Sequence, residues 1–185
     1  MYSLIATRKT GYKITNPNIP VIIRDNRGIL FYTTESMLPR ITSFNLPPGQ
    51  YMVDSGMFAP LNSPVTFGLL SLPANERLLK SPHNFRVVFG SNPNKCSILW
   101  GKDTILFDNS FKEKPLPQVQ FILGHEFGHQ FYKTEKYCDL YAANRMLRMG
   151  FNPSQIGLSP LESLSEGAYE RKKMMVNKLV ANAKR

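Results

Sequence analysis

Short apolar runs separated by turn residues fill the first part of the chain. Apolar segments 21–23 and 29–32 flank the polar turn 25–28, a pattern typical of a β-hairpin. A Pro-Pro-Gly turn precedes a further apolar stretch that starts at Tyr51, which predicts another strand. Closely spaced short strands with frequent proline are typical of a small β-sandwich or β-barrel, which we predict for residues 1–78.

Beyond residue 79 the pattern changes from strands to helices. Residues 84–90 predict a strand, and residues 96–100 and 104–107 predict a hairpin. From Pro117 the apolar positions recur at helical spacing, and proline suits the first turn of a helix.

Helices fill the rest of the chain. The helix from Pro117 is expected to stop near residues 131–133, and the next to run over 135–149, with Thr134 as its N-cap and Gly150 as its C-terminal glycine. A last helix is predicted over 165–183. We therefore predict an α+β protein with a β-rich domain, 1–78, and a compact second domain, 79–185.

Composition and charge narrow the class of protein. Hydrophobic residues make up 42% of the 185 residues and charged residues 19%, which excludes a disordered polyelectrolyte. The chain shows no transmembrane segment and no signal peptide, and its two cysteines form no disulfide framework, so we expect a cytoplasmic protein. A net charge of +10 favours contact with nucleic acid or another polyanion.

The sequence GHEFGH at residues 124–129 carries the clearest chemistry. His125 and His129 lie four residues apart on one helix face, so both imidazoles can reach one metal ion, for which Zn²⁺ is the typical choice. Glu126 follows the first histidine, a position from which a carboxylate acts as general base. Gly124 and Gly128 cost about 1 kcal/mol each in a helix, which indicates space beside a metal or a closely packed strand.

A catalytic zinc ion needs a third protein ligand. Glu135 and Asp139 open the next helix and lie four residues apart on one face. Glu135 is the expected ligand because it lies nearest the turn, although a first-turn acid can instead serve the helix dipole. Asp139 is the alternative ligand, or else it orients a histidine through the second ring nitrogen.

Residues 125–129 (HEFGH) and 135–139 (EKYCD), with Gly150 and 152–153 (Asn-Pro) after them, resemble the zincin metallopeptidases, and most closely the gluzincins. In that family HExxH is followed by E-x-x-A-D opening a later helix that ends in G-x-x-P. The resemblance covers residues 117–153.

The resemblance implies a zincin-like domain with an HExxH active-site helix that hydrolyses peptide bonds in a protein or peptide substrate. It assigns one Zn²⁺ per chain to His125, His129 and Glu135, the general base to Glu126 and a supporting role to Asp139.

Two further features concern the substrate. Zincins bind an extended substrate along an edge strand, for which 104–107 is the candidate, although an ordinary core strand fits it equally. The candidate donors to the transition-state oxyanion are Tyr132, Tyr137, Tyr141 and His83.

Other readings of HExxH remain open. Peptide deformylases combine it with an upstream cysteine ligand, and Cys96 lies upstream, but the surrounding residues lack that family's motifs. The alternative function is a non-catalytic metal-binding structural or assembly protein, for instance a component of a phage virion. Glu126 argues for catalysis, since a structural zinc site has no use for a free carboxylate beside an open position.

Overall fold

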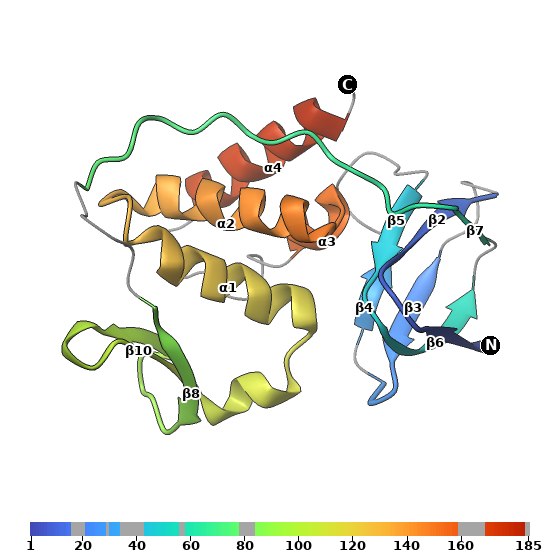
Figure 1. Ribbon diagram of the computed structural model, residues 1–185, viewed down its shortest axis with the longest axis horizontal. Helices are drawn as coiled ribbons and strands as arrows, with labels where there is room; N and C mark the ends of the chain where they lie inside the picture. The colour runs from blue at the N-terminus through green and yellow to red at the C-terminus, as the bar shows by residue number, and fades with distance from the viewer. Residues whose placement is uncertain are drawn as a thin grey trace.

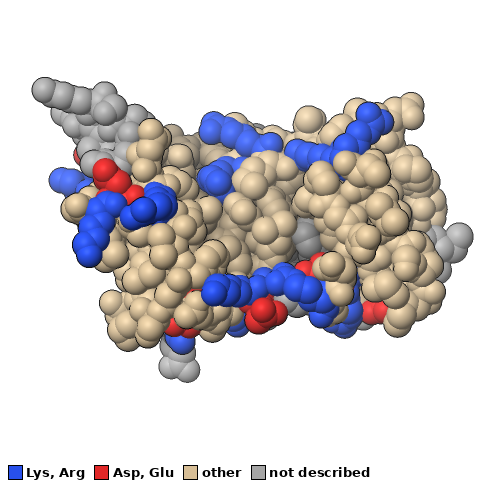
Figure 2. All heavy atoms as spheres, turned by 60° about the horizontal axis from the view of Figure 1, so that its bottom comes forward, with Lys and Arg blue, Asp and Glu red and all other residues tan. Residues whose placement is uncertain are grey.

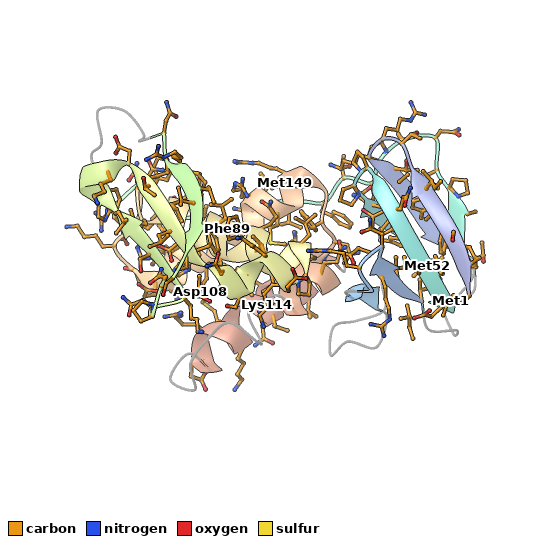
Figure 3. The ribbon with its side chains drawn as sticks, turned by 90° about the horizontal axis from the view of Figure 1, so that it is seen from below. Met1, Met52, Phe89, Asp108, Lys114 and Met149 are labelled. Atoms are coloured by element: carbon orange, nitrogen blue, oxygen red, sulfur yellow. The ribbon has the colours of Figure 1, made fainter. Side chains whose placement is uncertain are left out.

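The computed structural model describes residues 1–15, 21–28, 30–33, 43–55, 58–77, 84–158 and 169–183. Within these residues the chain forms three small sheets and four α-helices, which confirms the α+β class (Figure 1). Two sheets lie at one end of the molecule, and the third lies at the other end beneath the helices. The view in Figure 3 separates Met1 and Met52, at the first end, from Phe89 and Asp108, at the second.

The strands of the first 60 residues form two antiparallel sheets. The first has the order β1 (Tyr2–Ala6), β6 (Gly49–Ser55), β3 (Ile22–Asp25) and β4 (Leu30–Thr33), and the second has β5 (Ser43–Leu46), β2 (Thr10–Ile14) and β7 (Phe58–Pro60). The predicted hairpin is confirmed: β3 pairs with β4, and the turn ends at Gly28 with a φ of 81°. No sheet among the described strands closes into a barrel, and a sandwich stays a prediction.

The third sheet corrects one expectation. Its order is β8 (Arg86–Gly90), β10 (Thr104–Asp108) and β9 (Cys96–Leu99). The predicted hairpin is confirmed as the antiparallel pair β9–β10, but β8 adds parallel to the other side of β10. Strand β10 is therefore central, with Ile105 and Phe107 fully buried, and the expectation that 104–107 forms an edge is wrong. Within the hairpin, the strand at the edge of the sheet is β9.

The second long helix has the expected bounds, whereas the first ends at Gly128, earlier than the expected stop near residues 131–133, and turns follow it. The described elements are η1 (Trp100–Lys102), η2 (Asn109–Glu113), α1 (Leu116–Gly128), α2 (Glu135–Met149), α3 (Pro153–Leu158) and α4 (Tyr169–Ala183). Gly150 ends α2 with a φ of 86°, as predicted. The predicted start of the last helix, at residue 165, lies outside the described residues.

The start of α2 differs from the predicted cap. Thr134 occupies the N-cap position, but its side chain makes no capping bond. The carboxylate of Glu76 instead accepts hydrogen bonds from the backbone N–H groups of Lys133, at 2.7 Å, and Thr134, at 3.4 Å. A carboxylate from a distant segment thus satisfies the first donors near this helix N-terminus, which a sequence pattern of local caps does not predict.

Two hydrophobic cores meet at α1. The larger core joins strand residues such as Phe44 and Val53 to helix residues such as Phe121 and Met146, and so draws on both sides of residue 78. A division into domains at that position stays a prediction. The smaller core forms around Ile105, Phe107 and Phe111, against which the other face of α1 packs. Among the described residues no helix combines the length and apolar character needed to cross a bilayer.

Candidate metal centre

Close packing of α1 on α2 brings the motif residues to the second helix. A Cβ atom added at Gly124 would lie 3.0 Å from Cα of Ala142, and one added at Gly128 would lie 2.9 Å from Cα of Cys138. The two glycines therefore let the helix backbones approach, which no larger residue allows without a shift. The expected neighbour, a metal or a strand, is in fact a helix.

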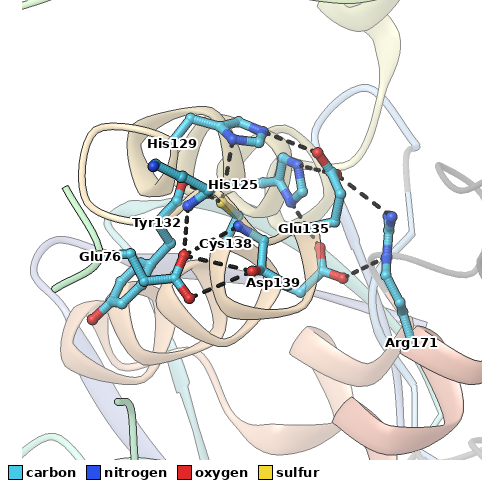
Figure 4. Close-up of polar contacts among 10 residues, drawn as sticks. Glu76, His125, His129, Tyr132, Glu135, Cys138, Asp139 and Arg171 are labelled. Atoms are coloured by element: carbon cyan, nitrogen blue, oxygen red, sulfur yellow. Dashed lines mark hydrogen bonds and ion pairs between the residues drawn. The ribbon is translucent and has the colours of Figure 1, made fainter. Parts of the chain in front are cut away.

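Two imidazoles and one carboxylate converge between α1 and the first turn of α2 (Figure 4). Nε2 of His125 lies 3.2 Å from Oε2 of Glu135, and Nε2 of His129 lies 3.5 Å from Oε1 of the same carboxylate. One ligand atom from each of the three residues lies within 4.8 Å of the others. The side chain of Glu135 is 49% exposed, so the cluster is open to solvent on one side.

Asp139 lies behind His125 rather than in the cluster. Its Oδ1 accepts a hydrogen bond from Nδ1 of His125 at 2.7 Å, and its side chain is only 2% exposed. Arg171 of α4 donates from Nε to Oδ2 of Asp139 at 3.1 Å, and its Nη1 lies 3.5 Å from Oε2 of Glu135. Of the two acids considered as third ligand, the structure brings Glu135 to both histidines and places Asp139 where it orients one of them.

The thiol of Cys138 contacts His129 at Nδ1, the ring nitrogen that points away from Glu135. Nδ1 of His129 lies 3.4 Å from Sγ of Cys138, and that sulfur lies 3.7 Å from the carbonyl oxygen of Tyr132, to which the thiol donates. Burial, together with the charges of Glu135 and Asp139, raises the pKa of Cys138 to about 12, so the thiol keeps its proton at neutral pH. Both histidines thus have Nδ1 engaged by neighbouring residues of α2, and both direct Nε2 toward Glu135.

Burial and charge shift the three motif residues differently. Burial lowers the pKa of His125, but the hydrogen bond to Asp139 and the surrounding carboxylates outweigh it, so the net shift is upward. Burial and the charge of His125 lower the pKa of His129. Burial raises the pKa of Glu126, with a further contribution from Glu135, while the charge of His125 opposes the increase. The raised pKa brings Glu126 closer to the range in which a carboxylate exchanges protons near neutral pH.

Glu126 and His129 both line a pocket next to the cluster. This pocket, of about 270 Å³, is lined by Arg77, Ile98, Trp100, Glu126 and His129. Ile98 belongs to the edge strand β9, so an edge strand does lie beside the motif helix, although it is not the strand that the sequence indicated. The sequence did not predict that Arg77 and Arg171 lie at the site. Both are far from the motif along a chain with many basic residues, and no spacing rule distinguishes them from the others.

Of the candidate oxyanion donors, the described tyrosines do not line this pocket. The hydroxyl group of Tyr132 donates to the carbonyl oxygen of Pro73 at 3.3 Å, and neither Tyr137 nor Tyr141 lines the pocket beside Glu126. His83 lies outside the described residues. Cys96 is not part of the cluster of His125, His129 and Glu135, and burial raises the pKa of its thiol, which disfavours the thiolate that a metal ligand requires.

Neither the charge on the surface nor the comparisons with known proteins identify a partner or a family for this chain. On the face shown in Figure 2, Lys and Arg side chains occur in separate groups rather than as one continuous stripe, and contact with a polyanion stays a prediction. Comparisons with protein-family models, curated proteins and solved structures find no match for this chain.

Proposed function

We propose that the chain is a zinc-dependent metallopeptidase with a zincin-like catalytic region. His125, His129 and Glu135 hold the metal, and Glu126 is the general base. The observation that carries the proposal is that the Nε2 atoms of both histidines lie near the carboxylate of Glu135, while Glu126 remains outside this group and lines a pocket.

The donor set fits zinc. Two imidazole nitrogens and one carboxylate oxygen are the protein ligands of many catalytic zinc sites, in which the fourth position is left for water or substrate. Asp139 and the Cys138 thiol occupy the Nδ1 atoms, so both Nε2 atoms are available. Zinc bound here would polarise a scissile carbonyl and lower the pKa of a bound water toward ~7.

The protein's own residues supply proton transfer and substrate placement. Glu126 accepts a proton from the attacking water and passes it to the leaving amine, a role suited to a carboxylate whose pKa is raised by burial. The edge strand β9 contributes Ile98 to the same pocket, and unpaired backbone groups at such an edge can bind an extended peptide.

Replacing Glu126 tests the proposal because glutamine keeps the shape but cannot accept the proton. The wild-type protein with zinc should cleave an unstructured protein such as casein, and Glu126→Gln should keep its zinc while losing at least about 100-fold in rate. Glu113→Gln, at an exposed position on η2, is the matched control and should cleave as the wild type does.

Two results would count against the proposal. Zinc-loaded wild-type protein that cleaves nothing would favour the structural or assembly role. Undiminished cleavage by Glu126→Gln would remove Glu126 from the mechanism.

A further inference from the structure

Arg77 lines the pocket beside Glu126, and no acidic residue in the described ranges pairs with it. The backbone N–H of Arg77 donates to the carbonyl oxygen of Phe131 at 3.1 Å, which ties this segment to the end of the motif helix. The guanidinium carbon lies 5.9 Å from the centroid of the Trp100 ring. Nε of Arg77 is buried and has no hydrogen-bond partner among the described residues.

The unpaired Nε–H of Arg77 lowers the stability of the fold unless a ligand in the pocket accepts a hydrogen bond from it. A buried donor such as this Nε–H, which gives up water without gaining an acceptor, lowers stability. Glu126 lines the same pocket, yet no ion pair joins it to Arg77 in the described part of the chain. The fork of guanidinium N–H groups matches the two oxygens of a carboxylate.

The rest of the pocket fits the same class of ligand. Ile98 and Trp100 provide apolar wall for the carbon atoms that carry a carboxylate, and about 270 Å³ accommodates a group of that size. A second carboxylate near Glu126 would be repelled without a compensating cation, which Arg77 supplies. The net charge of +10 also favours the approach of acidic substrates.

We propose that Arg77 forms a carboxylate-binding subsite, so that the enzyme selects peptides with a carboxylate close to the scissile bond. The inference rests on the proposed peptidase function. The carboxylate comes either from an Asp or Glu side chain or from the free C-terminus of the substrate, and the guanidinium group binds both in the same way.

Peptide binding tests the subsite without catalysis. Zinc-loaded Glu126→Gln protein is titrated with short alanine peptides that carry one glutamate at successive positions, each paired with its glutamine twin and amidated at the C-terminus. A neutral peptide with a free C-terminus, paired with its amide, tests the other source. Trp100 is the single tryptophan of the chain and borders the pocket, so its fluorescence reports binding.

At least one acidic peptide should bind about ten-fold or more tightly than its neutral twin. Adding Arg77→Gln should reduce that ratio to below about two-fold, and Arg77→Lys should give an intermediate value. Arg86→Gln, at an exposed arginine on β8, is the control and should leave the ratio unchanged. Equal binding of every acidic and neutral pair to protein with Arg77 intact would overturn the proposal, as would a preference that survives Arg77→Gln.

Kinetics on the same pairs separate the subsite from a role in transition-state stabilisation. Arg77→Gln should raise KM for the acidic peptide and reduce its advantage in kcat/KM over the neutral twin. An equal loss of kcat on both twins, with the ratio intact, would contradict the subsite. If the wild-type protein cleaves no peptide, the proposed function fails, while the binding titration still decides the role of Arg77.

Discussion

Asp139 accepts a hydrogen bond from Nδ1 of His125 at 2.7 Å, across the interface between α1 and α2. In the neutral imidazole, a carboxylate at Nδ1 favours the proton on that nitrogen, which leaves the lone pair on Nε2, the atom that lies 3.2 Å from Glu135. The neighbouring residue, Cys138, places its neutral thiol 3.4 Å from Nδ1 of His129, a weaker contact than that of a carboxylate. Two successive residues of α2 therefore set the orientation of both histidines.

Glu135 and Asp139 should differ sharply in their effect on zinc affinity. Glu135→Ala removes a proposed ligand and should abolish tight binding, whereas Asp139→Asn removes an orienting partner and should weaken binding about 10–100-fold. Competitive titration with a chelator ranks the two variants. Glu170→Ala, at an exposed acid on α4, should bind zinc as the wild type does. If Asp139→Asn lost the metal while Glu135→Ala kept it, the two roles would have to be exchanged.

Gly128→Ala should destabilise the protein although alanine is the better helix former. Alanine gains about 1 kcal/mol in propensity, but its Cβ would lie 2.9 Å from Cα of Cys138. Overpacking of this kind typically costs about 1–3 kcal/mol, and a shift of α2 would also carry Glu135 away from His129. Denaturant unfolding of the zinc-free protein and a zinc titration should therefore both show a loss.

The matched control for this variant is Gly101→Ala, because a Cβ at Gly101 meets nothing within 4 Å. That substitution should leave zinc affinity unchanged. A Gly128→Ala protein that is as stable as the wild type and binds zinc equally well would show that the helix contact does not need glycine.

Local patterns predicted much of the fold. The hairpin β3–β4, the bounds of α2 and the left-handed Gly150 all depend on residues close together in the sequence, and each was predicted correctly. The central position of β10 depends on the parallel partner β8, which the hairpin pattern does not contain. The capping contact of Glu76 likewise joins distant segments.

For the candidate site, too, the residues close together in the sequence were predicted and those from distant segments were not. HExxH places two histidines and Glu126 on one helix, so these residues are visible in the sequence. The choice between Glu135 and Asp139 depends on how closely two helices pack, which the glycines determine through contacts that only the folded chain shows. Arg77 comes from an extended segment that returns to the motif helix, and no spacing rule connects the two.

Asp108 should make the stability of the fold depend on pH in the acidic range. Hydrogen bonds from the side chain and backbone of Ser110, and from the backbone of Asn92, lower the pKa of Asp108 to about 2. A carboxyl whose pKa is depressed on folding stabilises the protein above its unfolded value, near ~4, and loses that contribution as the pH falls to about 2. Asp108→Asn should therefore be less stable than the wild type at pH 7, and the difference should shrink in that window.

Thermal unfolding at a series of pH values measures the difference between the two proteins. Glu113→Gln, at an exposed carboxylate on the adjacent 3-10 helix, should show no such trend. A gap between wild type and Asp108→Asn that stays constant from pH 7 to pH 2 would exclude stabilisation by the hydrogen bonds that the ionised carboxylate accepts from Ser110 and Asn92.

The most direct test of the account is the metal content of the purified protein. After exposure to zinc and removal of the excess, elemental analysis should find about one zinc per chain in the wild type and in Glu126→Gln, and less than about a tenth of that in His129→Ala. Cys96→Ser should keep its zinc, because Cys96 lies outside the cluster. A wild-type protein with less than about a tenth of a zinc per chain, or a His129→Ala protein that retains the full amount, would contradict the metal centre proposed for His125, His129 and Glu135.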